Sequence, residues 1–204
     1  MCSRMEDVMT DKARAALIQL LGPLEWLRLK NSGEVRPTDA VGVVRLTEDG
    51  QKEVVVCHWG FVPAGMGEAE LKRYTLFNAR IETLGQSRVF ADAFRSQRCV
   101  IPLSAFYEWP TVEGKKQKTR MSRPDGLPLL VAGLWNRTTG PLGVVESCTV
   151  VTRPPTPDVQ GVHDRMPALL LSGELEAWLH GTPKQTQAAA LSSWRPGVLD
   201  IKAV

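Results

Sequence analysis

Four side chains in this sequence carry the functional groups that covalent catalysis requires. They are the thiol of Cys2, the amide of Asn78, the carboxylate of Glu108 and the imidazole of His163. Together they could supply a nucleophile, a proton donor and acceptor, and a group that positions the reactants. Structural roles are the alternative: Glu108 could pair with an arginine, His163 could be a core histidine, and Asn78 could be a turn residue.

Cys2 has a further option because it directly follows Met1. A small second residue lets methionine aminopeptidase remove Met1, which would leave an N-terminal cysteine. Its amine, with an ordinary pKa of about 7.7–8.0, and its thiol, of about 8.5, then lie on adjacent carbons. Such a 1,2-aminothiol condenses with an aldehyde, as the amine forms a Schiff base and the thiol closes a five-membered thiazolidine. The alternative is an incidental cysteine on a frayed terminus.

The other three cysteines lie within apolar runs, namely Cys57, Cys99 and Cys148. This placement predicts reduced, buried thiols that behave as small hydrophobic side chains. The sequence has no C-x-x-C pair and no paired cysteine and histidine spacing, which argues against a zinc site. We therefore expect neither a metal nor a cofactor.

The composition is that of an ordinary globular chain, with 204 residues, 43% apolar and 23% charged. A chain of this length buries about 70% of its unfolded surface. No run approaches the roughly 18 uncharged apolar residues of a membrane helix, and the charged N-terminal segment does not resemble a signal peptide, so we expect no membrane contact and a cytoplasmic location. The net charge of +3 permits nucleic-acid binding without requiring it.

Apolar periodicity and capping residues predict both helices and strands. Helices are expected over Asp11–Leu21 after a Thr10 cap, Leu24–Leu29, Ser87–Arg95, Ser172–Gly181 after a Ser172 cap, and onward from a Thr182–Gln185 capping box. Strands are expected in a Val41–Trp59 hairpin and over Cys99–Ile101, Leu129–Leu134 and Val144–Val151. The basic segment Thr111–Leu127 is typical of the exposed end of a hairpin, or of a polyanion contact. The irregular order predicts an α+β fold with a mixed or antiparallel sheet.

Seven short motifs occur in order along nearly the whole chain. They are Met1-Cys2-Ser3-Arg4, Arg36-Pro37-Thr38, Trp59-Gly60-Phe61-Val62-Pro63, Asn78-Ala79-Arg80-Ile81-Glu82-Thr83, Arg98-Cys99-Val100-Ile101-Pro102, Phe106-Tyr107-Glu108-Trp109 and His163-Asp164-Arg165-Met166-Pro167. Together they resemble the SRAP family (SOS response-associated peptidase). The resemblance implies a single α+β domain over residues 1–204, with a bifurcated, barrel-like sheet surrounded by helices.

The resemblance also implies an activity, the crosslinking of the N-terminal cysteine to abasic sites in single-stranded DNA. Glu108 would then transfer protons while the sugar opens and the Schiff base forms, Asn78 would hold the terminus and the sugar, and His163 would relay a proton. The family positions that contact DNA correspond here to Arg4, Pro37, Trp59, Arg80, Thr152 and Arg165. We expect a monomer that acts on single-stranded DNA, near the nucleoid or replication fork in a bacterium.

Three residues depart from the family pattern. Ser3 replaces a usual glycine, Gly65 replaces a second tryptophan, and Pro155 replaces an asparagine downstream of Thr152. The serine would lose freedom to adopt positive φ, and the other two changes weaken the expected DNA surface.

Two other functions remain open from the sequence. One is a thiol peptidase that uses Cys2, Glu108 and His163 on peptides or on its own N-terminal bond. The other is a non-catalytic module that binds single-stranded DNA and in which Cys2 is inert.

Overall fold

The computed structural model describes residues 2–25, 33–63, 76–140, 143–191 and 197–204. Its helices are α1 (Asp11–Leu21), α3 (Ala91–Ser96), α4 (Leu175–His180) and α5 (Pro183–Leu191), with 3-10 turns η2 (Leu84–Gln86) and η3 (Ser172–Glu174). Its strands are β1 (Met5–Glu6), β2 (Glu34–Val35), β3 (Ala40–Leu46), β4 (Lys52–Trp59), β5 (Asn78–Arg80), β6 (Arg98–Leu103), β7 (Ala105–Glu108), β8 (Thr111–Val112), β9 (Lys115–Lys116), β10 (Thr119–Ser122), β11 (Leu129–Gly140), β12 (Gly143–Arg153), β13 (Met166–Pro167) and β14 (Asp200–Ala203). The expected α+β class is confirmed.

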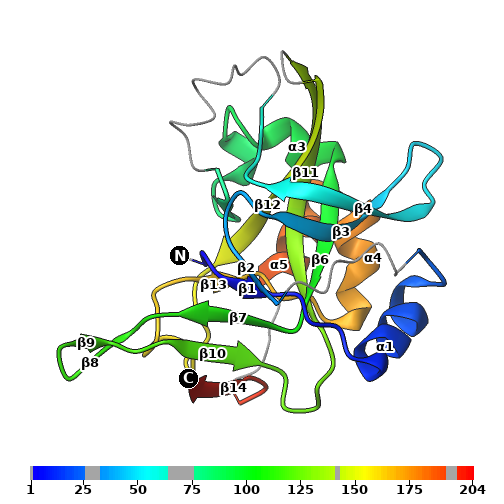
Figure 1. Cartoon of the computed structure of the whole chain (residues 1–204). Helices are drawn as coiled ribbons and strands as arrows, with labels where there is room; N and C mark the ends of the chain where they lie inside the picture. The colour runs from blue at the N-terminus through cyan, green and yellow to red at the C-terminus, as the bar shows by residue number, and fades with distance from the viewer. Residues whose placement is uncertain (1, 26–32, 64–75, 141–142, 192–196) are drawn as a thin grey trace.

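A barrel forms the centre of the molecule (Figure 1). Within the described residues, its five strands run in the order β11, β6, β3, β4 and β12, and the pairing of β12 with β11 closes the ring. The β4–β12 pair is parallel, whereas the other pairs in the ring are antiparallel. The barrel is therefore mixed, and β5 and β13 extend it by pairing with β12.

A second, antiparallel sheet branches from the barrel in the order β14, β10, β7, β1 and β2. The chain passes from β6 in the barrel to β7 in this sheet through Ser104, whose amide donates to the carbonyl of Glu6 at 2.8 Å. Figure 1 shows the short β8–β9 hairpin extending away from both sheets. The branch matters for function because it pairs the N-terminal strand β1 with β7, so that Met5 lies opposite Phe106.

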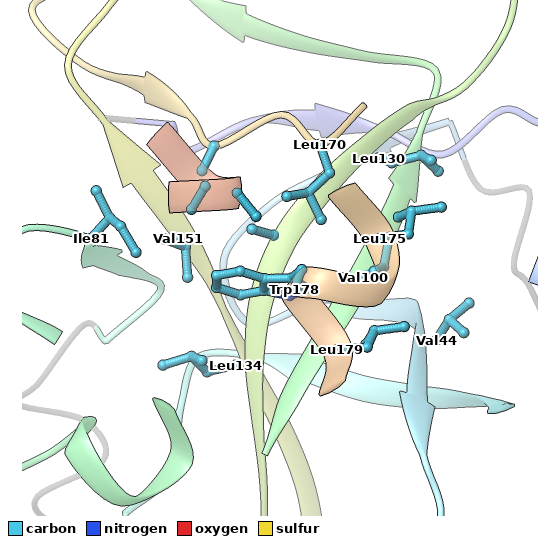
Figure 2. Close-up of a cluster of buried hydrophobic side chains, with 14 of the residues drawn as sticks. Val44, Ile81, Val100, Leu130, Leu134, Val151, Leu170, Leu175, Trp178 and Leu179 are labelled. Atoms are coloured by element: carbon cyan, nitrogen blue, oxygen red, sulfur yellow. The ribbon is translucent and has the colours of Figure 1, made fainter. Parts of the chain in front are cut away.

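The barrel strands β3 and β6 are buried along almost their whole length, which explains their apolar runs. Along β6, Cys99 and Ile101 belong to a cluster of strand and loop residues that fills the barrel, while Val100 between them faces the helices. Val100 belongs to a second buried cluster, which lies between the barrel and the helices. Figure 2 shows this cluster, with the Trp178 ring of α4 lying near Val100. All four cysteines are buried and free, so the expected state of the three internal thiols is confirmed.

A buried arginine joins the barrel to its helices. The guanidinium of Arg98 on β6 donates five hydrogen bonds of 2.6–3.1 Å to backbone carbonyls at the ends of α3 and α4, those of Phe94, Arg95, Trp178, Leu179 and Gly181. Carbonyls at helix C-termini lack partners within the helix and carry partial negative charge. Arg98 therefore satisfies both helix ends with one side chain.

Two predicted helix starts are confirmed. Thr10 caps α1, and its hydroxyl accepts a hydrogen bond from the Ala13 amide at 3.2 Å. Thr182 and Gln185 form the expected capping box before α5, in which the Thr182 amide donates to the Gln185 side chain at 2.9 Å. The segment expected over Leu24–Leu29 lies mostly outside the described residues, and its described part is not helical. None of the helices in the described ranges is long and apolar enough to cross a membrane.

Other predicted bounds are wrong in detail. The helix expected over Ser87–Arg95 begins at Ala91, because the Ser87 hydroxyl accepts the Phe90 amide at 3.2 Å and holds a preceding turn. The capping residue of the segment before α4 is Leu171 rather than the expected Ser172, and the Leu171 amide donates to the Glu174 carboxylate at 2.8 Å.

The basic segment Thr111–Leu127 is exposed only in part. Its first portion forms the exposed β8–β9 hairpin, as expected. Its second portion is β10, which lies between β7 and β14 and buries Met121 in the core.

Candidate active site

The structure brings Asn78 to the N-terminal segment. Asn78 begins β5, which is held against β12 by parallel pairing, and its side-chain Nδ2 donates to the backbone carbonyl oxygen of Cys2 at 2.8 Å. The amide oxygen Oδ1 of Asn78 is buried and has no hydrogen-bond partner among the described residues. An asparagine in this place orients residue 2 and keeps a free acceptor for another group.

Cys2 is not on a frayed end, because its residue is only 1% exposed. Its Sγ makes a weak contact of 3.9 Å with the carbonyl oxygen of Arg4. Burial, together with the negative charge of Glu108, raises the pKa of the Cys2 thiol far above its ordinary range. The thiol is therefore protonated at neutral pH.

Glu108 is a buried carboxyl at the end of β7, with 4% of its residue surface exposed. Burial is the main cause that raises its pKa from 4.5 to about 7, and the charge of Asp164 makes a smaller contribution in the same direction. A carboxyl with this pKa holds a proton on about half of the molecules at neutral pH, so it can both donate and accept one.

His163 faces Glu108 from the loop before β13. Its Nε2 lies 3.8 Å from Oε2 of Glu108, and its Nδ1 accepts a hydrogen bond from the Arg165 amide at 2.9 Å. Burial lowers the pKa of His163, although Asp164, whose Oδ1 lies 2.8 Å from Nδ1, acts in the opposite direction. Because Nδ1 accepts the hydrogen bond from the Arg165 amide, we assign the proton of the neutral ring to Nε2, the nitrogen that faces Glu108.

The loop that carries His163 is held by Arg165. This guanidinium makes a two-point ion pair with Glu82 at 2.6 and 2.9 Å and donates to the Thr152 carbonyl at 2.8 Å. Thr152 itself is buried on β12. In this state Arg165 positions the loop, and the Thr152 side chain faces Arg165 and β5 rather than solvent.

Trp59 is a core residue in this structure, with 0% of its surface exposed. Its indole Nε1 donates to the Phe77 carbonyl at 2.9 Å. The rings of Trp59 and Phe77 pack edge to face, with their centres 6.1 Å apart. The expected contact of this ring with DNA stays a prediction, and in this structure the ring is fully covered. Pro37 is half-buried in the turn 36–39, in which Thr38 has φ of 81°.

Arg80 and Arg4 are two expected DNA contacts that solvent can reach in this structure. Arg80 ends β5 and is exposed. Arg4 pairs with Glu34 at 3.0 Å, and its guanidinium lies 5.6 Å from the centre of the Trp109 ring. Glu34 carried no signal in the sequence, because its strand partner is distant along the chain.

The departures from the family pattern have different outcomes. Ser3 is not among the described non-glycine residues with positive φ, so its side chain causes no strain there. Gly65 lies outside the described residues. Pro155 follows β12 in a half-buried loop position. Among the residues that the structure describes, no group of histidine, cysteine and acidic side chains could hold a metal ion.

Sequence and structure comparisons agree on one family. The model of the family "SOS response associated peptidase (SRAP)" matches residues 1–204. Abasic site processing protein YoqW of Bacillus subtilis is 33% identical over 137 residues, which cover 66% of this chain and 60% of that protein. Abasic site processing protein YMR114C of Saccharomyces cerevisiae is 31% identical over 150 residues, covering 73% of this chain and 39% of that protein.

Solved structures show the same fold. A crystal structure of a Bordetella bronchiseptica protein superposes with a TM-score of 0.84 at 26% identity, over 100% of this chain and 99% of that one. A Bacteroides thetaiotaomicron protein superposes with a TM-score of 0.85 at 19% identity, over 100% of this chain and 92% of that one. The aligned region of this chain spans about 60% of the length of the Bacillus relatives it matches. On the full-length family match, the chain belongs to the SRAP family.

Proposed function

We propose that this protein binds single-stranded DNA at abasic sites and forms a covalent thiazolidine crosslink through Cys2 after removal of Met1. The observation that carries the proposal is the hydrogen bond from Asn78 to the Cys2 carbonyl, and it is supported by the electrostatic interaction of Cys2 with Glu108, whose carboxyl lies 3.8 Å from His163. Relatives named abasic site processing proteins support the choice of substrate.

The first step joins the Cys2 amine to C1′ of the opened abasic sugar. Ring opening moves a proton between the C1′ hydroxyl and the ring oxygen, and attack by the amine on the aldehyde forms a carbinolamine. Loss of water then gives the Schiff base. Glu108 suits both proton transfers, because its pKa of about 7 keeps both of its forms populated at neutral pH.

The second step closes the ring. The Cys2 sulfur adds to the Schiff-base carbon, and the imine nitrogen gains the proton that the thiol loses, so the overall condensation releases one water. Burial keeps this thiol protonated until the step occurs. His163, with its proton on Nε2, is placed to relay protons to and from Glu108 through a bridging water, since 3.8 Å exceeds a direct hydrogen bond.

The same groups favour the crosslink over peptide cleavage. A peptidase would attack with the Cys2 thiolate, and burial together with the charge of Glu108 disfavours that form. The crosslink instead begins with the amine, whose ordinary pKa of about 7.7–8.0 leaves a useful neutral fraction at physiological pH.

The test incubates protein that lacks Met1 with a single-stranded oligonucleotide carrying one abasic site. A heat-stable adduct is expected on a denaturing gel, with the mass of protein plus DNA minus one water. Cys2→Ala should form none, whereas Cys148→Ala, which changes another buried thiol, should still react. Absence of an adduct from the processed protein overturns the proposal, and release of a defined peptide would assign a peptidase instead.

A further inference from the structure

We propose that Arg4 and Lys118 form a phosphate-binding site beside Cys2, and that the Glu34 carboxylate occupies this site in the free protein until a DNA phosphodiester displaces it. The inference rests on the proposed function insofar as the anion is DNA. It adds a binding residue, Lys118, and a competing residue, Glu34, to that function.

Two cations converge on one carboxylate in this place. Oε2 of Glu34 accepts Nη1 of Arg4 at 3.0 Å, and Oε1 of Glu34 accepts Nζ of Lys118. The three side chains are 24–32% exposed, so solvent and a ligand can reach them. Glu34 lies on the edge strand β2, two strands away from β7. A carboxylate held between two cations has the charge arrangement of a bound phosphate.

Arg4 is held much less completely than Arg165. The Arg165 guanidinium donates two hydrogen bonds to Glu82 and a third to a backbone carbonyl. The Arg4 guanidinium donates to Glu34 through Nη1 alone. The Nε of Arg4 is buried and has no hydrogen-bond partner among the described residues. Because a guanidinium is shaped for two-point contact with an oxyanion, the single contact with Glu34 uses only part of the binding capacity of Arg4.

The cations have supports that do not depend on Glu34. The Arg4 guanidinium lies 5.6 Å from the Trp109 ring centre, and Nζ of Lys118 lies 4.4 Å from the Tyr107 ring centre. The Tyr107 amide also donates to the Arg4 carbonyl at 3.0 Å. These aromatic contacts would remain after Glu34 is displaced, so both cations would stay in place to bind a phosphate.

Exchange of one anion for another is energetically accessible at this site. The hydrogen bond from Lys118 lowers the pKa of Glu34, so the carboxylate is charged at neutral pH and competes with phosphate. Partly exposed ion pairs contribute little to stability, because water screens them. Removal of the Glu34 charge should therefore free the site without unfolding the protein.

The experiment measures noncovalent binding of a short fluorescent oligothymidylate by anisotropy, over a series of salt concentrations, in the full chain carrying Cys2→Ala. Glu34→Gln is expected to tighten binding about three- to tenfold at low salt. The slope of log K against log salt should steepen by about 0.7 for each further phosphate neutralised.

Glu176→Gln is the matched control, because it removes one carboxylate on α4 from a surface ion pair with Lys52 of β4 and changes the net charge equally. The double variant Glu34→Gln, Lys118→Gln should lose the gain in affinity. If Glu34→Gln binds no more tightly than Glu176→Gln, or if neither binds, the inference is overturned. Crosslinking is measured in a separate assay, as the covalent adduct formed by protein that retains Cys2. Failure of the proposed crosslink is therefore distinguishable from failure of the proposed phosphate site.

Discussion

Nε2 of His163 lies 3.8 Å from Oε2 of Glu108, and burial moves the pKa values of the two groups toward each other, upward for the carboxyl and downward for the imidazole. A carboxylic acid and a neutral imidazole can therefore coexist at neutral pH. This is the combination that reversible proton transfer needs.

The rate of crosslinking should have a narrow maximum in pH. Glu108 acts as an acid below its pKa of about 7, while the amine attacks only when it is deprotonated, with an ordinary pKa of about 7.7–8.0. We expect a maximum between these values, measured as adduct formed per unit time in quenched samples. Glu108→Gln should slow the reaction by about 10²–10⁴ and remove the decline on the alkaline side. An unchanged profile in Glu108→Gln would exclude this residue as the acid.

Glu108→Gln should also stabilise the fold at alkaline pH. Burial raises the pKa of this carboxyl from 4.5 to about 7, so the folded protein holds the proton more tightly than the unfolded chain. The native state therefore loses stability as pH rises from 4.5 through 7, and glutamine avoids that loss. The gain should be roughly 1–3 kcal/mol near pH 8 and close to zero at about pH 4, below the unfolded pKa, measured by urea denaturation. Equal effects at both pH values would contradict the assigned pKa.

Asn78→Ala should slow crosslinking without weakening DNA binding. The variant loses the hydrogen bond to the Cys2 carbonyl, and displacement of a reacting group by about 1 Å can cost on the order of 10² in rate. Asn136→Ala is the matched control, since Asn136 donates a similar bond of 2.7 Å to the Val62 carbonyl. Single-turnover rates and anisotropy on the same oligonucleotide separate the two effects. An equal loss of rate in both variants would indicate general destabilisation.

Arg98→Met should destabilise the protein by about 3 kcal/mol or more, because methionine fills the space but leaves the buried carbonyls at two helix ends unpaired. Arg95→Met is the control: this side chain is 60% exposed, and its loss should change stability by about 0.5 kcal/mol or less. Urea denaturation measures both free energies of unfolding. Similar values for the two variants would refute a structural role for Arg98.

The local elements of this fold could be read from the sequence. The Thr10 cap, the Thr182 capping box and the hairpin of β3 and β4 depend on residues within a few positions of each other. The apolar runs of β6, β11 and β12 likewise indicated buried strands. The predicted helix bounds differ from the structure where a side chain hydrogen-bonds to the backbone near the helix start, as the Ser87 hydroxyl does before α3.

The motif order and the residue types identify four candidate residues, Cys2, Asn78, Glu108 and His163. Their spacing in the sequence does not show that they lie close together in the structure. Closure of the barrel by β11 and β12, and its branching into the second sheet, bring them together. The same folding buries Trp59 and places Glu34 between Arg4 and Lys118. These outcomes depend on strand pairing between distant segments and on the burial it produces, which local propensity and periodicity do not encode.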